Sequence, residues 1–434
     1  MTLDPQIIGY IGIIVMLLLM FLRVPVAFAM ATVGFVGFYL INGLIPSLNI
    51  MQSTFYGVLR SESFVAVPLF ILMGYFAYHS GIVTNLFKTA TKWVGHAPGG
   101  IVQATILGGA GFGATSGSGL ASTATLAKIA YPEMIKSGVD RKLAYGAIAS
   151  VGPLAVMIPP SILMIVFAII TQQSIGKLLI GGLLPGLFAA VIYMVMVYIL
   201  VKRNPAIAPS VAKPPLEERL QSLKNIWGFV ILVFVIVAGL YSGFFTPTEA
   251  GSIGAFVVFV MLLIMQGFKW QIIKDSIIQT ITTSSMIFLL VCSTYVFSYF
   301  ITVTRIPTNL SNLLVSLPVD PIVILLAVIL MYLIMGMFMD MMSAMFLTLP
   351  ILFPSIIALG FDPIWFGVML VFLVEVALVT PPFGLSLFIL NGAVPGSDMK
   401  EIYRGSIPFI VADFVIIALF ILFPEIITFL PSLM

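Results

Sequence analysis

Small polar residues and paired prolines interrupt otherwise apolar segments of this 434-residue sequence, and they are its best candidates for chemistry. The first such segment, residues 99–134, gathers Gly, Ser and Thr at its middle, where a spanning helix is normally most apolar. Irregular backbone at membrane depth is stable only where protein surrounds it or water reaches it. We therefore predict a re-entrant hairpin with its tip at residues 114–119. A close-packing helix face is the alternative, because glycines also recur here at four-residue steps.

The next segment, residues 141–171, has the composition of one spanning helix that is broken in its middle. Two adjacent prolines there lack amide donors, so the helix must unwind. The unwinding leaves the carbonyl oxygens of Ala155, Met157 and Ile158 without intrahelical partners, which is costly in lipid. A hard cation such as sodium would satisfy several of these oxygens at once. A structural kink without an ion is the alternative.

The second half of the sequence offers the same two features independently. A polar tip is expected at residues 335–343, and a second proline pair stands at Pro381 and Pro382. Broken helices at matched positions of two halves are typical of the binding sites of secondary transporters. Asp340 and Glu375 add two acidic groups at membrane depth, which makes both functional candidates, although either could be neutral or paired within the protein.

Other kinds of chemistry are poorly represented in this sequence. The single cysteine, Cys292, and the two histidines exclude a disulfide framework and do not supply a metal-ligand cluster. An intramembrane enzyme would need a nucleophile with a base, or metal ligands, and neither is found, so no enzyme is expected. We expect no cofactor, only sodium as a coupling ion, and no nucleic-acid partner. Arg305 is a candidate for attracting an anion, although interfacial snorkelling is the simpler explanation.

The candidate residues belong to a chain that must be dissolved in lipid. It is 61% hydrophobic and 8% charged, whereas soluble proteins are roughly 25% charged. Apolar runs long enough to span a membrane recur about ten times. The first run passes through Arg23 and Pro25 into a second span without a small-residue cleavage site, which favours a retained helix over a signal peptide. We predict an all-α polytopic membrane protein.

The sequence also repeats itself with a period near 222 residues. The matches are mainly prolines and glycines, which fix backbone geometry, so they indicate shared bends rather than shared hydrophobicity. At an offset of 222, the first set pairs Pro25, Pro132, Gly138, Asp140, Pro159 and Pro160 with Pro247, Pro354, Gly360, Asp362, Pro381 and Pro382. At an offset of 223, the second set pairs Ser174, Lys177, Gly182, Pro185 and Ala189 with Ser397, Lys400, Gly405, Pro408 and Ala412.

The charges orient these two halves about a polar linker at residues 202–225, which we place on the cytoplasmic side. With five full spans and one hairpin in each half, all Lys and Arg residues except Arg60, Lys177 and Arg305 fall inside, as the positive-inside rule favours. An odd number of spans turns the second repeat upside down relative to the first, and both termini are then outside. The first repeat is residues 1–201, with hairpin 99–134 and broken helix 141–171. The second is residues 226–434, with hairpin 321–356 and broken helix 363–391.

Several motifs in this order resemble the large membrane subunit of the TRAP transporters, which are tripartite carriers that work with a periplasmic binding protein. The resemblance covers essentially the whole chain. It is carried by Pro68 to Gly74, Ser116-Gly117-Ser118, Pro132-Glu133-Met134, Ile158-Pro159-Pro160-Ser161, Phe245 to Ala250, the Met-Gly-Met-Phe run that leads to Asp340, and Thr380-Pro381-Pro382 with Gly384.

The resemblance implies a scaffold part and a transport part that moves like an elevator, together with two sodium sites and a substrate position between the hairpin tips. The first sodium site would comprise Gly113, Ser116, Ala155, Ile158 and Pro160. The second would comprise Gly336, Ala377, Thr380 and Phe383, largely through main-chain oxygens. The substrate would face Ser118, Ser161 and Asp340, with Arg305 on the outer side.

The sequence departs from the usual family pattern at three positions. The family often has Asn where Leu373 stands, Gly at Ala377 and Asn at Ser386. A main-chain ligand survives the exchange of Gly for Ala, whereas side-chain contacts at the other two positions would be lost.

The sequence thus predicts a sodium-coupled importer subunit in the bacterial inner membrane. Its substrate would be a small carboxylate-bearing organic anion delivered by a periplasmic binding protein, and a small four-span membrane subunit would be its partner in the lipid bilayer. A single-component sodium:anion symporter of related fold is the nearest alternative, and a passive channel is another.

Overall fold

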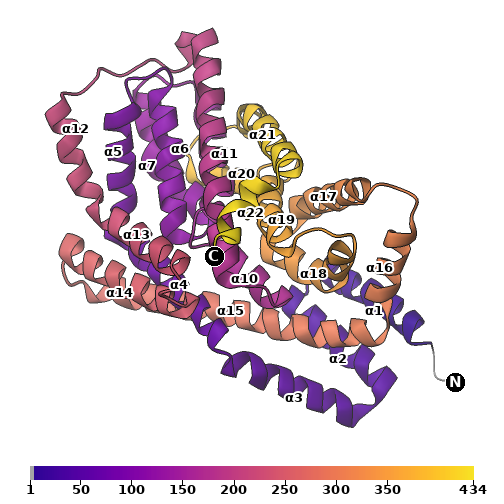
Figure 1. Ribbon diagram of the computed structural model, residues 1–434. Helices are drawn as coiled ribbons and strands as arrows, with labels where there is room; N and C mark the ends of the chain where they lie inside the picture. The colour runs from indigo at the N-terminus through magenta and orange to yellow at the C-terminus, as the bar shows by residue number, and fades with distance from the viewer. Residues whose placement is uncertain (1–3) are drawn as a thin grey trace.

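A computed structural model describes residues 4–434, and over this range the chain is built from helices and loops with no strand (Figure 1). The first half contains α1 Pro5–Phe21, α2 Val26–Asn42, α3 Leu44–Arg60, α4 Glu62–Ser80, α5 Ile82–Val94, α6 Gly100–Ser116, α7 Gly119–Lys136, α8 Arg141–Ala149, α9 Val151–Met157, α10 Ile162–Thr171 and α11 Ile175–Arg203. The second contains α13 Trp227–Tyr241, α14 Pro247–Gln266, α15 Trp270–Val303, α16 Ile306–Ser316, α17 Pro321–Phe338, α18 Met341–Ala358, α19 Pro363–Leu378, α20 Leu385–Ala393, α21 Met399–Leu422 and α22 Glu425–Ser432.

Many of these helices are long and apolar enough to cross a membrane. Eight meet that description among the described residues, and α8 to α10 together form a ninth segment that is bent by 44° at its break. The predicted all-α polytopic architecture is confirmed. Several shorter helices between the spans are absent from the prediction, among them α3, α5 and α16, because polar residues interrupt their apolar faces.

Helix boundaries recur along the chain at the offset found in the sequence. α7 begins at Gly119 and ends at Lys136, and α18 begins and ends 222 positions later. α2 with α14, α6 with α17, and α10 with α20 agree to within two residues at each end at the same offset. Shared prolines and helix caps therefore produce shared helix ends, while the inverted orientation of the two halves stays a prediction.

The halves differ at one long segment. In the first half, Ser61 separates α3 from α4, whereas the corresponding stretch of the second half is the single 34-residue helix α15. A helix of that length extends for roughly 50 Å at 1.5 Å per residue. Figure 1 shows α15 lying along the lower part of the molecule, beneath the helices that carry the hairpins.

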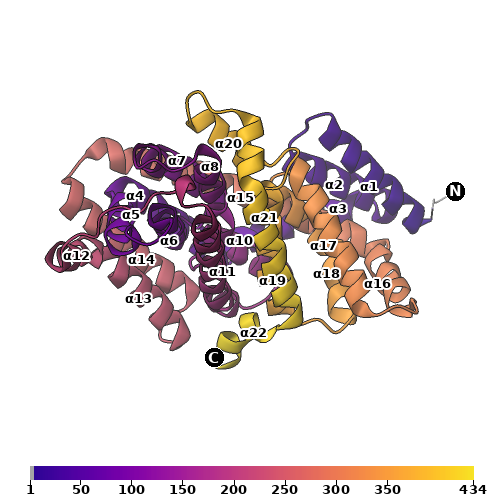
Figure 2. The ribbon, with the colours of Figure 1, turned by 90° about the horizontal axis from the view of Figure 1, so that it is seen from above.

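Two groups of helices can be distinguished by their packing. In the first group, α4 lies along α14 and α2 lies along α15. In the second group, α9 contacts α6, α7, α11 and α19, and α21 lies along α8. We call them the outer group (α1–α4 and α13–α15) and the hairpin group (α6–α11 and α17–α22). Figure 2 shows α19 and α21 running beside α11 near the middle of the molecule.

The linker at residues 202–225 contains structure of its own. α12 (Leu216–Leu223) packs against α5. Thr89 donates a hydrogen bond to the Ser222 carbonyl at 3.0 Å, and the Trp93 indole donates to the Arg219 carbonyl at 3.1 Å. The Arg219 guanidinium also lies over the Trp93 ring at 4.5 Å, a cation–π contact. The linker is therefore packed against the first half through α5.

Candidate functional site

The candidate site begins at the tips of two helical hairpins, α6–α7 and α17–α18. Ser118 is the N-cap of α7 and Asp340 is the N-cap of α18, and these residues stand 222 positions apart. Both tips lie within the predicted ranges but are shorter, because only two residues separate the helices of each hairpin. Each tip therefore presents the start of a helix, where amide groups lack intrahelical partners.

The first tip is held by a small network of hydroxyl groups. The Ser118 hydroxyl accepts a hydrogen bond from the Ala121 amide at 3.4 Å, and the Ser122 hydroxyl donates to the Ser118 carbonyl at 2.7 Å. The Ser116 hydroxyl lies 3.4 Å from the Ser122 hydroxyl and accepts from the Ser118 amide at 3.4 Å. The long 3.4 Å contacts are weak hydrogen bonds, so these oxygens keep the capacity to bind a ligand.

The second tip carries a negative charge in place of a hydroxyl. One carboxylate oxygen of Asp340 accepts from the Ser343 amide at 3.1 Å, and the other accepts from the Ser343 hydroxyl. Asp340 is only partly buried. A carboxylate can accept several hydrogen bonds at once, so capping leaves it free to face a ligand.

The first broken helix packs directly on the first tip. A Cβ atom at Gly113 would collide with the backbone of Ala155, and one at Gly117 would come within 2.8 Å of the Pro160 carbonyl oxygen. The hairpin backbone can approach the unwound segment this closely only because both positions are glycine. The predicted ligands Gly113 and Ala155 are thus in contact, and Pro160 lies against Gly117, four residues further along the hairpin.

Two other backbone groups of this break differ in their surroundings. The Ile158 amide bonds to the Leu154 carbonyl at 3.4 Å, whereas within residues 4–434 no backbone amide donates to the Ile158 carbonyl. The Met157 carbonyl lies against Gly182 of α11. Of the carbonyls left bare by the prolines, that of Met157 is therefore turned toward the neighbouring helix and not toward the hairpin.

The second broken helix repeats the contact with its hairpin. A Cβ atom at Gly336 would collide with the side chain of Ala377. The Thr380 hydroxyl donates to the Val376 carbonyl at 2.7 Å, and the Thr380 amide donates to the Ala377 carbonyl at 3.2 Å. The turn after α19 is thus partly satisfied by its own residues.

The far end of the second break carries two aromatic contacts. Tyr403 of α21 donates a hydrogen bond to the Pro382 carbonyl at 2.6 Å. Phe383 is 47% exposed, and its ring lies 4.8 Å from that of Phe338 on α17. A main-chain role for Phe383 is compatible with this exposure, since its side chain points away from the buried core.

A cavity of about 430 Å³ separates the first tip from the outer group. It is lined by Ser116 and Ser118 on one side and by Tyr75 of α4 and Thr283 of α15 on the other, whose hydroxyls lie 3.1 Å apart. Met341, at the start of α18, also lines it. Both hairpin tips therefore border this cavity.

A larger cavity of about 930 Å³ adjoins the second tip. Asp340 and Ser343 line it, together with Ser285 of α15 and Arg23 in the turn between α1 and α2. The cavity therefore carries one positive and one negative side chain, of which only Arg23 can attract an organic anion.

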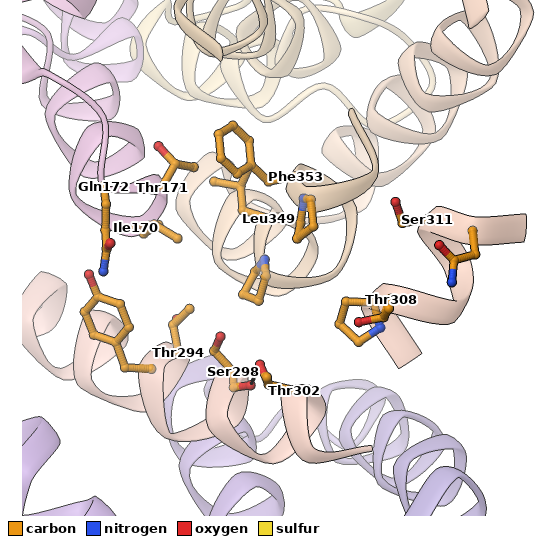
Figure 3. Close-up of a pocket in the computed structure, with 15 residues that line it drawn as sticks. Ile170, Thr171, Gln172, Thr294, Ser298, Thr302, Thr308, Ser311, Leu349 and Phe353 are labelled. Carbon is orange, nitrogen blue, oxygen red and sulfur yellow. Dashed lines mark hydrogen bonds between the residues drawn. The ribbon is translucent and has the colours of Figure 1, made fainter. Parts of the chain in front are cut away.

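A third cavity, of about 430 Å³, lies further along α15 (Figure 3). Hydroxyl and amide groups from the end of α10, α15 and α16 line one part of it, including Gln172, Thr294, Ser298 and Thr308, and apolar residues of α18 such as Leu349 and Phe353 line another. None of the predicted sodium or substrate residues lines it. Arg305 is exposed in the turn between α15 and α16, close in sequence to this cavity, and it does not line the cavities at the hairpin tips.

Two predicted positions are more enclosed than the sequence suggests. Ser161 is fully buried as the N-cap of α10, where its hydroxyl accepts from the Met164 amide at 3.4 Å, and the adjacent Ile162 lines the first cavity in its place. Glu375 is fully buried in α19, and both of its carboxylate oxygens lack a hydrogen-bond partner of normal geometry.

One buried acidic group was not predicted from the sequence. Asp413 of α21 is fully buried and accepts a hydrogen bond from the Tyr193 hydroxyl of α11. An acidic residue inside an apolar run is the signal that could have found it. Among residues 4–434, no group of three or more His, Cys, Asp or Glu side chains is placed to hold a metal. A cation at the tips would therefore depend mainly on main-chain and hydroxyl oxygens, with no more than a single carboxylate beside them.

Comparison with known proteins agrees with this geometry. The family model "Tripartite ATP-independent periplasmic transporter, DctM component" matches residues 13–426. The chain belongs to this family. It is 34% identical over 372 residues to the C4-dicarboxylate TRAP transporter large permease protein of Pseudomonas aeruginosa, covering 85% of this chain and 84% of that one. It is 28% identical to the sialic acid TRAP transporter large permease protein of Vibrio cholerae, covering 99% and 98%.

Solved structures agree at the level of the fold. The Alcanivorax borkumensis YdaH transporter superposes with a TM-score of 0.61 at 14% identity, over 88% of this chain and 90% of that chain. The family match and the relatives above identify the chain as a TRAP transporter large permease subunit, a multi-pass protein of the inner membrane. Membership of a tripartite family implies two further components, a small membrane subunit and a periplasmic binding protein.

Proposed function

We propose that the permease imports a small carboxylate-bearing anion together with sodium ions, which bind where each hairpin meets its broken helix. The observation that carries the proposal is the repeated contact of a tip glycine with an alanine of the broken helix. Gly113 meets Ala155 in the first half, and Gly336 meets Ala377 in the second. Such close approaches bring main-chain oxygens of two segments together, and hard cations are held by oxygen ligands of this kind.

The substrate position that we propose lies between the two tips. The cavity bordered by Ser116, Ser118 and Met341 adjoins the starts of α7 and α18, and helix N-termini favour anions. The C4-dicarboxylate and sialic acid relatives act, by name, on carboxylate-bearing compounds. Asp340 would repel such a substrate, so cations bound near the tips are needed to offset its charge. This requirement favours coupling to sodium over passive passage.

We further propose that the hairpin group moves relative to the outer group in an elevator-like way. Both tip cavities contact the first half of α15, through Thr283 and Ser285, whereas the third cavity contacts the second half, through Thr294 and Ser298. The start of α15 is predicted to be cytoplasmic, so we propose that the tips face the inside in this arrangement. A shift of the hairpin group along α15 would bring the tips toward the second half of this helix.

The partners follow from the tripartite family. We propose that a periplasmic binding protein delivers the anion and that a small four-span membrane subunit binds this chain. A single-component sodium:anion symporter is the alternative, and it would need neither partner. Finding the genes for both partners beside the gene for this chain would favour the tripartite assembly.

The proposal is tested by uptake into proteoliposomes that contain the permease with its small subunit. The binding protein is supplied outside with a panel of radiolabelled C4-dicarboxylates and sialic acid. We expect accumulation of at least one of these acids under an inward sodium gradient and none under an equal potassium gradient. Equal uptake under both gradients would contradict sodium coupling and favour a passive channel. Uptake without the binding protein would favour the single-component symporter.

A further inference from the structure

Glu375 is a buried acid at the meeting point of the two halves. It belongs to α19 of the second half, and it is 0% exposed. Its carboxylate lies against Gly119 and Gly152, both of the first half, and a Cβ atom at Gly119 would collide with it. Neither carboxylate oxygen has a hydrogen-bond partner of normal geometry among the described residues. One half therefore inserts an acid into the hairpin and broken helix of the other, where the only backbone donor within its reach among residues 4–434 is the Gly119 amide at the start of α7.

This position is next to the first proposed sodium site. Gly152 and Ala155 are three residues apart on α9, so they are neighbours on its surface, with roughly 5–6 Å between such positions. Ala155 contacts Gly113 of the hairpin, and Gly119 directly follows the capping residue Ser118. The carboxylate thus lies about one helical turn from the contact that defines the site.

The charge of the site explains why an acid would be placed there. Every oxygen that we assign to the first sodium site is a neutral carbonyl or hydroxyl, so a bound cation would be buried without a counter-charge. Burying an unpaired charge is unfavourable. The first turn of α7 supplies only roughly half a positive charge to Glu375, so an ionised carboxylate here also lacks a full partner. A sodium ion would satisfy both needs.

We propose that Glu375 is the anionic component of the first sodium site, which is therefore built from both halves of the chain. This inference rests on the sodium coupling proposed above. It also predicts that the two sites differ. The residue that corresponds to Glu375 in the first half, 222 positions earlier, is Pro153, so the second site receives no equivalent charge. Binding of sodium at the first site would hold α19 against the start of α7.

The test measures the thermal unfolding midpoint of the purified permease as sodium replaces potassium at constant ionic strength. Glu375→Gln removes the charge and keeps the shape of the side chain. We expect the wild-type midpoint to rise with sodium, and the half-saturating sodium concentration to increase about tenfold or more in E375Q, a loss of about 1.4 kcal/mol of binding free energy. Asp413→Asn is the matched control, because Asp413 is equally buried but pairs with Tyr193; we expect its sodium response to be unchanged.

The outcomes separate this inference from the proposed function. If sodium leaves the wild-type midpoint unchanged, sodium coupling itself is contradicted. If the wild type responds and a folded E375Q variant responds equally, sodium coupling stands and the role of Glu375 is overturned, because a neutral structural carboxyl would tolerate the amide. An equal loss in D413N would also overturn it, since any buried acid would then matter.

A second variant tests the role of Glu375 if E375Q does not fold. Gly119→Ala keeps the carboxylate but pushes it from its position, and we expect a severalfold loss of sodium affinity. Gly57→Ala, at a glycine whose added Cβ meets nothing within 4 Å, is the control. A folded G119A variant with wild-type sodium affinity would overturn the inference.

Discussion

The two modules formed by a hairpin and a broken helix share a backbone plan and differ in charge. Both place a glycine of the hairpin on an alanine of the broken helix, and both begin the second hairpin helix with a side-chain cap. The first tip is neutral and hydroxyl-rich, and its charge arrives from Glu375 of the other half. The second tip carries its own charge in Asp340.

A repeated backbone can therefore support two sites that differ in charge. The positions fixed by proline, glycine and helix caps are the ones that recur, because they determine where helices stop and how closely segments approach. The acids at the site do not recur, since Ser118 corresponds to Asp340 and Pro153 corresponds to Glu375. The geometry of ion binding would then be common to both modules, whereas its electrostatics would be specific to each.

The largest expected effect comes from filling the close approach in either module. Gly113→Val or Gly336→Val forces the hairpin away from Ala155 or Ala377, which should abolish sodium-driven uptake. Gly57→Val is the control, because an added Cβ there meets open space. The effect is measured as uptake of the panel acids into proteoliposomes. The monodispersity of each variant after solubilisation in detergent checks its insertion. Normal uptake in either tip variant would break the proposed equivalence of the modules.

The next effect should come from the charge at the second tip. Asp340→Asn removes the charge, but Asn caps helices as well as Asp does. We expect initial uptake rates to fall by roughly tenfold or more, which corresponds to about 1.4 kcal/mol. Asp362→Asn, at the exposed N-cap of α19 where the Trp365 amide is 2.7 Å from the carboxylate, tests capping alone. Similar rates in D340N and D362N would mean that Asp340 only caps its helix.

A smaller effect should distinguish the hydroxyl groups of the two modules. Ser116 makes only 3.4 Å contacts, whereas the Thr380 hydroxyl is engaged by the Val376 carbonyl at 2.7 Å. Ser116→Ala should therefore weaken the apparent sodium affinity of uptake by severalfold, and Thr380→Val should weaken it less. Sodium titrations of the initial uptake rate test the order. The reverse order would show that the Thr380 hydroxyl, and not main-chain oxygen, binds the second ion.

The smallest expected effect concerns the Tyr403 hydroxyl at the second break. Tyr403→Phe removes its hydrogen bond to the Pro382 carbonyl, and such a bond contributes about 1 kcal/mol. We expect the unfolding midpoint without sodium to fall slightly and uptake to remain close to wild type. A complete loss of uptake in Y403F would place Tyr403 in the transport machinery.

Features set by local chain chemistry could be predicted from the sequence. The proline pairs indicate both breaks, and the first helix indeed bends by 44° there. The tip residues are found because small polar residues are conspicuous in an apolar segment. Short amphipathic helices such as α5 were missed, since their apolar faces are too brief to signal a span.

Long-range contacts could not be predicted in the same way. Nothing local to α19 indicates that Glu375 faces Gly119, because the two residues belong to different halves and meet only through packing. The Met157 carbonyl faces α11 for the same reason: the prolines leave it bare, but the neighbouring helix decides its direction. Ser161 is likewise buried, and the adjacent Ile162 lines the cavity in its place.

The central claim is that each module binds one sodium ion during transport. The most direct measurement is the initial rate of uptake of the transported acid into proteoliposomes as a function of external sodium, with the small subunit and the binding protein present. We predict that the initial rate depends sigmoidally on the sodium concentration. Its Hill coefficient should approach two, the number of proposed sites, since cooperativity is limited by the number of sites. A rate that is independent of sodium would contradict the claim. A purely hyperbolic dependence would also contradict it if only one sodium ion is carried with each anion.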